Sequence, residues 1–169
     1  MKRLAECAGR ELLWAQRSHF SVESQLHDGE EVCARLEWHW GFNPTAEGET
    51  EEGRWRFRRR GFFSGVHEIF TAGEDQPLAT CRFRWWTGTL RFRDGREWSW
   101  RRESFWGGRW RFETGSGAPL LHMRRRFAFP GTRAVFRLEP ELAASSEASM
   151  LTLFGWYLIL RLRRRAHAY

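Results

Sequence analysis

The sequence has almost no lysine. Of its 28 basic residues only Lys2 is a lysine, so the other 27 are arginines. A phosphate-binding loop of the usual kind needs a lysine after a glycine-rich turn, and no Gly-x-Gly-x-x-Gly pattern opens a helix here. Ser64 misses the spacing of a nucleophile elbow by one residue. Because no catalytic group of residues is visible, we expect a protein that is not an enzyme.

Cysteine is also scarce, and its positions offer no metal site. The cysteines form no Cys-x-x-Cys pair, and the histidines show no short ligand spacing. We therefore expect no metal and no other cofactor, and reduced, structural cysteines at Cys7, Cys33 and Cys81. Glu6 and Glu11 interrupt the start of the chain, so it does not resemble a secretory signal and a cytoplasmic protein is expected.

No apolar run has the length of a membrane span. The run Met150–Leu160 has 11 residues, which is roughly 16 Å of helix against a hydrocarbon core of about 30 Å. It is apolar on all sides, which predicts a core helix over residues 146–164 that is needed for folding. Gly155 would let a neighbouring ring approach this helix closely. A short membrane anchor with a basic flank is the alternative.

Aromatic residues are abundant, with 11 Trp and 14 Phe, and they favour β structure. They alternate with arginine at a period of two residues, so each such strand has an aromatic face and a charged face. Glycine-containing turns separate these segments. The pattern predicts a mainly β fold, a closed antiparallel barrel of about ten to twelve strands around the C-terminal helix, in a single domain over residues 1–169 and as a monomer.

The alternation also predicts which way the side chains point. The aromatic residues expected to point inward are Trp55, Phe57, Phe83, Trp85, Phe92, Trp98, Trp100, Trp110 and Phe112, and the arginines expected to point outward are Arg56, Arg84, Arg91 and Arg111. Residues 43–53 carry four glutamates and are expected to form an exposed acidic loop.

The alternating strands, the turn Phe92-Arg93-Asp94-Gly95 and the apolar segment Met150–Leu160 together resemble the tubby C-terminal-like superfamily, which includes the LURP-one-related proteins and the phospholipid scramblases. The resemblance covers most of the chain and lies in its architecture. It implies a closed barrel of about twelve strands around a hydrophobic C-terminal helix. Tubby proteins bind phosphoinositides through basic residues, but no stretch here matches that site. The calcium-binding and cysteine-rich segments of scramblases have no counterpart either.

Three functions remain open at this point. The first is a non-enzymatic module, peripheral to a membrane or acting as a scaffold, that binds anionic lipid or phosphoinositide through an arginine face comprising Arg56, Arg58, Arg84, Arg91, Arg93 and Arg111. The same arginines could instead form only a solvated face. The second is a lipocalin-type carrier of a small hydrophobic ligand, suggested by Gly53-Arg54-Trp55 and Gly108-Arg109-Trp110. The third, nucleic-acid binding, is disfavoured because alternation separates arginines from aromatic rings.

Overall fold

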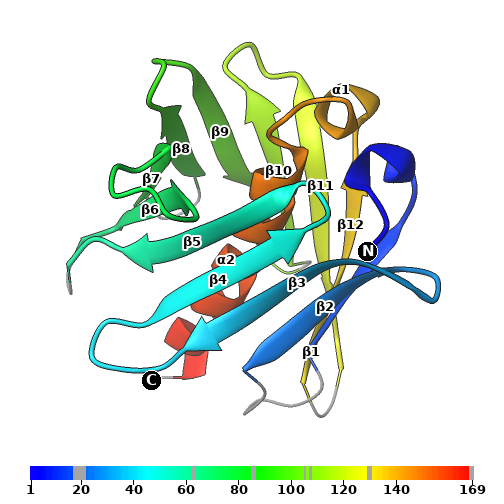
Figure 1. Ribbon diagram of the computed structural model, residues 1–169, viewed down its shortest axis with the longest axis horizontal. Helices are drawn as coiled ribbons and strands as arrows, with labels where there is room; N and C mark the ends of the chain where they lie inside the picture. The colour runs from blue at the N-terminus through cyan, green and yellow to red at the C-terminus, as the bar shows by residue number, and fades with distance from the viewer. Residues whose placement is uncertain are drawn as a thin grey trace.

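The computed structural model describes residues 1–16, 22–61, 64–84, 87–104, 106, 108–128 and 131–167. This part of the chain forms a closed antiparallel barrel of twelve strands, in which each strand pairs with its neighbours in the sequence and β1 pairs with β12 (Figure 1). The strands are β1 (Leu12–Gln16), β2 (Glu23–Asp28), β3 (Glu31–His39), β4 (Thr45–Thr50), β5 (Gly53–Arg59), β6 (Val66–Thr71), β7 (Ala79–Arg84), β8 (Thr87–Phe92), β9 (Glu97–Arg102), β10 (Arg109–Thr114), β11 (Pro119–Arg126) and β12 (Thr132–Leu138). The helical segments are η1 (Leu4–Cys7), α1 (Pro140–Ala143) and α2 (Ala148–His167).

The aromatic faces of the strands point into the barrel, as the period-two alternation predicts. Six of the named rings are buried, namely Trp55, Phe57, Phe92, Trp100, Trp110 and Phe112. Phe83 and Trp98 are partly buried and pack against the core, and Trp85 lies outside the described residues. None of the four arginines expected outside is buried. Removing so many large rings from water is the main force that closes the sheet.

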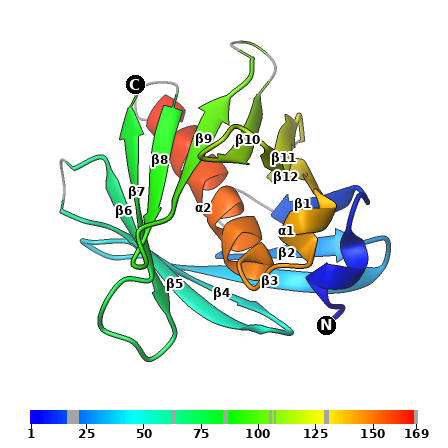
Figure 2. The same ribbon diagram turned by 90° about the horizontal axis from the view of Figure 1, so that it is seen from above.

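Helix α2 lies inside this barrel (Figure 2). Every residue from Ala148 to Leu160 is buried, so the helix is buried on all sides. Trp156 stacks on Trp14 of β1 with 5.3 Å between ring centroids, and Tyr157 stacks on Trp38 of β3 at 5.2 Å. The expected core helix is confirmed, with its ends a few residues from the predicted ones. Among the described residues, no helix has the length and apolarity of a membrane span.

Two glycines let the helix and the barrel wall approach closely. A Cβ atom added to Gly155 would lie 2.7 Å from Sδ of Met123 and 3.3 Å from Cε2 of Phe136. On the opposite side, a Cβ atom added to Gly48 of β4 would lie 2.8 Å from a methyl carbon of Leu153. Both distances are shorter than ordinary van der Waals contact. The expected close approach of a ring to Gly155 is therefore confirmed.

The prediction of an exposed acidic loop at residues 43–53 is wrong. Residues 45–50 form β4, and Glu51 and Glu52 form a tight turn into β5. Ala46, Gly48 and Thr50 face the interior of the barrel. They are small because α2 lies close to this strand, so the sequence lacks the large inward side chains by which the other strands are recognised.

The two ends of the barrel differ. At the capped end, η1 and α1 lie against each other, and Leu4, Cys7, Leu142 and Ala143 are buried there (Figure 1). At the distal end, the odd-numbered strands end, the even-numbered strands begin, and α2 reaches its C-terminal turns. Any ligand that approaches the C-terminal end of α2 does so from the distal end.

Candidate functional site

The six arginines proposed from the sequence do not share one surface. Arg56 and Arg58 lie on β5, where both guanidinium groups cover the ring of Phe70 at 4.8 and 4.7 Å from its centroid. Phe70 points outward from β6 yet is only 1% exposed. Such contacts between a cation and an aromatic ring contribute roughly 0.5–2 kcal/mol. These two arginines therefore shield an apolar side chain from water.

Glu68, next to this ring, binds two arginines. Its carboxylate accepts hydrogen bonds from Nε of Arg58 at 2.8 Å and Nε of Arg60 at 3.0 Å. Burial by itself would raise the pKa of Glu68, but the two guanidinium groups outweigh that effect and lower it. The charged form of Glu68 is thus the stable one in the folded protein.

We expect Glu68→Gln to lower the free energy of unfolding by about 1–3 kcal/mol at neutral pH, because two charge-assisted hydrogen bonds weaken. The lowered pKa means that this stabilisation is present above the ordinary carboxyl pKa and is lost as pH falls through the folded value. Urea unfolding of both proteins should therefore show a difference that shrinks below about pH 4. A difference that stays constant down to pH 2.5 would contradict the ion-pair explanation.

Three more of the six arginines are engaged with acidic partners. Arg91 pairs with Glu97, Arg93 with Glu74, and Arg111 with both Glu103 and Glu113. Arg91 and Arg93 lie towards the capped end, far along the strands from Arg84. Among the described residues Arg84 has neither an ion pair nor a ring contact. Most of the six arginines predicted to bind an anionic ligand are therefore already paired with acidic side chains of the protein.

A group of arginines without acidic partners lies elsewhere, on the outer face of β10, β11 and β12 at the distal end. Arg109 is directly opposite Arg124, and Arg126 is directly opposite Arg133. The side chains of these four arginines make no ion pair or hydrogen bond with another described residue. Like charges directly opposite each other destabilise a sheet. We call these four residues the distal arginines.

Exposed aromatic side chains lie in several connections at the same end. Phe127, which directly follows β11, is 100% exposed, Phe42 between β3 and β4 is 93% exposed, and Trp106 between β9 and β10 is 91% exposed. Trp40 and Val22 are exposed there too. Among the described residues, Met1 is the one other large apolar side chain that is exposed, and it lies at the capped end. The distal end therefore combines unpaired cations with apolar rings in water.

The sequence pattern pointed to neither group. The alternation of arginine with aromatic residues indicates single strands, whereas the distal arginines belong to three strands whose pairing the sequence does not give. The run Arg124-Arg125-Arg126 was the available signal.

Comparison with known proteins identifies no relative of this chain. No protein-family model, curated protein or solved structure matches the chain. Its function must therefore be inferred from its own geometry and chemistry.

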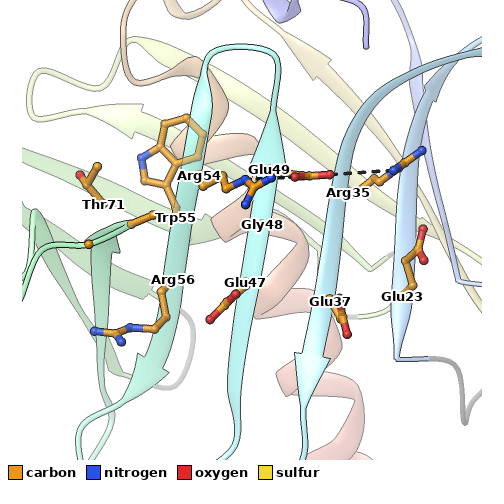
Figure 3. Close-up of a pocket in the computed structure, with 12 residues that line it drawn as sticks. Glu23, Arg35, Glu37, Glu47, Gly48, Glu49, Arg54, Trp55, Arg56 and Thr71 are labelled. Carbon is orange, nitrogen blue, oxygen red and sulfur yellow. Dashed lines mark ion pairs between the residues drawn. The ribbon is translucent and has the colours of Figure 1, made fainter.

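A concave, strongly charged groove lies on the outer face of β2 to β5 (Figure 3). Glu23, Glu37 and Glu47 are directly opposite one another on three neighbouring strands. Two residues further along the strands, on the same face, Glu49 pairs with Arg35 and Arg54. No described group of three or more acidic, histidine or cysteine side chains is placed to hold a metal ion. This groove is a charged sheet surface and offers no candidate site.

The cysteines are not candidate nucleophiles. Cys7, Cys33 and Cys81 are buried and none forms a disulfide. Burial raises the pKa of Cys7 to about 12, and it also raises the pKa of Cys33 and of Cys81. Reactivity requires the thiolate, which is therefore absent at neutral pH.

Proposed function

We propose that this protein docks on anionic membrane surfaces with its distal end. The observation that carries the proposal is the combination, at one end of the barrel, of the distal arginines and the exposed rings of Phe42, Trp106 and Phe127. Large apolar side chains exposed in several connections at one end of a barrel, together with arginines that lack acidic partners, indicate a surface that contacts another molecule.

The chemistry of a bilayer surface fits both groups. Aromatic side chains favour the interface between headgroups and acyl chains, and arginine binds phosphate through two parallel hydrogen bonds. Each basic residue near an anionic leaflet contributes about 1 kcal/mol. Bound phosphate would also relieve the repulsion between Arg109 and Arg124 and between Arg126 and Arg133.

The architecture supports the same proposal over its alternatives. A barrel closed around an apolar helix is what the resemblance to the tubby C-terminal-like superfamily implies, and we retain membership of that superfamily as a proposal. A lipocalin-type carrier would hold its ligand in the centre of the barrel, which α2 occupies here.

Flotation with phospholipid vesicles tests the proposal. The native protein should bind vesicles containing phosphatidylserine, and binding should weaken as salt rises because exposed charges are screened over about 8 Å. The triple variant Arg124→Gln, Arg126→Gln and Arg133→Gln loses about 3 kcal/mol, which is roughly a hundredfold in affinity.

The matched control is Arg54→Gln, Arg91→Gln and Arg93→Gln. It removes the same net charge from ion-paired positions towards the capped end and should change affinity less than threefold. Equal retention on neutral and anionic vesicles, or equal losses in the two triple variants, would overturn the proposal. So would preferential binding to a single-stranded oligonucleotide over anionic vesicles.

A further inference from the structure

A pocket of about 660 Å³ opens at the distal end between α2 and strands β6, β7 and β9. Its volume is in the usual range for sites that hold a small molecule. It lies apart from the distal arginines, which are on the outer face of β10 to β12. The lining side chains are His67, Phe83, Arg84, Trp100, Leu158, Arg161 and Leu162.

Two glycines and the position of α2 create the space. The helix packs mainly against β3 to β5 and against β11 and β12, which leaves room on the side of β6 to β9. Gly65 lines the pocket without a side chain, and Gly88 of β8 lies under the ring of Phe83, whose Cδ1 would be 3.2 Å from an added Cβ. Phe83 can therefore lie flat against the barrel wall.

The aromatic wall of the pocket is already ordered. The ring of Phe83 makes edge-to-face contacts with Trp100 at 5.2 Å and with His67 at 5.1 Å between centroids. Such contacts hold a ring in one orientation. Leu158 and Leu162 of α2 supply the apolar wall on the other side. An alkyl chain would contact apolar atoms on both sides with little rearrangement.

The charges that line the pocket are all positive. Arg84 of β7 and Arg161 of α2 contribute to the lining, and neither forms an ion pair with a described residue. None of the described residues that line the pocket is acidic. Nδ1 of His67 lies 2.8 Å from the hydroxyl oxygen of Tyr157, so these buried polar groups satisfy each other. The pocket is thus lined by apolar side chains and by two arginines, of which Arg84 is the last residue of β7 at the distal end.

We propose that this pocket binds one single-chain anionic amphiphile, with the alkyl chain between Phe83 and Leu162, which are only partly buried, and the anionic head on Arg84 and Arg161. A carboxylate and a phosphate monoester share the required chemistry, because each accepts paired hydrogen bonds from a guanidinium group. The proposal does not depend on docking to membranes, since a monomeric amphiphile reaches the pocket from solution.

Isothermal titration with dodecanoate, below its micelle-forming concentration, tests the proposal on the full chain. Arg84→Ala and Arg161→Ala should each weaken binding about tenfold, because each removes charge-assisted hydrogen bonds. Leu162→Trp should weaken binding at least tenfold, because the larger side chain occupies the place of the alkyl chain beside Phe83. The matched control is Arg82→Ala, which removes an exposed arginine from the same strand and face outside the pocket and should change affinity less than twofold.

Two further ligands separate the parts of the proposed ligand. Dodecyltrimethylammonium has the chain with the opposite charge, and inorganic phosphate has the charge without the chain, so both should bind at least tenfold more weakly than dodecanoate. Dodecyl phosphate should bind like dodecanoate. Equal binding of the cationic amphiphile, equal binding of inorganic phosphate, or an unchanged affinity in Leu162→Trp would each overturn the pocket assignment.

Vesicle flotation of the same variants distinguishes this proposal from the docking proposal. If dodecanoate fails to bind while the native protein still floats with anionic vesicles, the pocket assignment falls and docking stands. If dodecanoate binds and the native protein does not bind vesicles, the docking proposal is wrong and the pocket assignment is supported.

Discussion

Removal of residues 150–169 should leave a chain that does not fold. The segment supplies a helix whose residues from Met150 to Leu160 are buried and contact opposite walls of the barrel. Each large core side chain that is lost costs about 2–5 kcal/mol, against a total stability of about 5–15 kcal/mol. The loss exceeds what a domain of this size can tolerate.

Circular dichroism and heat denaturation of the shortened chain measure this effect. We expect no cooperative thermal transition, and exposed apolar surface that binds a hydrophobic dye. The full chain purified in parallel is the control. A soluble shortened chain with a sharp transition would show that the helix is a detachable element, which would revive the short membrane anchor considered from the sequence.

Replacing Trp156 by alanine should have the largest effect of any single truncation of a side chain. Trp156 is fully buried in the middle of α2 and stacks on Trp14 with 1° between the ring planes. Loss of a buried tryptophan side chain costs about 3–5 kcal/mol, because the cavity that it leaves is only partly filled by its neighbours.

Urea unfolding followed by far-ultraviolet circular dichroism gives the comparison. The matched control is Trp106→Ala, since Trp106 is 91% exposed and its removal should change the free energy of unfolding by at most about 0.5 kcal/mol. If Trp156→Ala costs less than 1 kcal/mol, the tight packing between α2 and β1 is not what holds the helix in place. The same Trp106 variant should bind anionic vesicles more weakly, which links the two tests.

The sequence was most informative where large side chains alternate. The segment Arg54 to Arg58 predicted both the strand and the direction of each side chain. Aromatic and charged residues alternate there at a period of two residues, and only a strand with one buried face places them on opposite sides in this way. The apolar stretch around Gly155 likewise predicted a core helix. The strand β4 was missed because Gly48 and Ala46 leave space for Leu153, and that space exists only once the helix is in place.

The candidate sites depend on which strands are neighbours, and local patterns do not give that. Arg109 and Arg124 are 15 residues apart in the sequence but directly opposite in the sheet. The pairing of Arg58 with Glu68 is equally invisible, although it decides that this arginine is engaged. Charge on a strand is therefore predictable from the sequence, whereas its availability to a ligand depends on the register of the strands.

The order of the elements along the chain has a consequence for synthesis on the ribosome. β1 must wait for β12 to close the barrel, and the helix that lies inside it follows all twelve described strands. At about 5–20 residues per second, the growing chain carries unclosed strands with aromatic faces for roughly ten seconds before α2 emerges. Such long-range closure is slow and exposes strand edges to other chains. A nascent chain of this protein should therefore need protection by a chaperone until translation has passed α2.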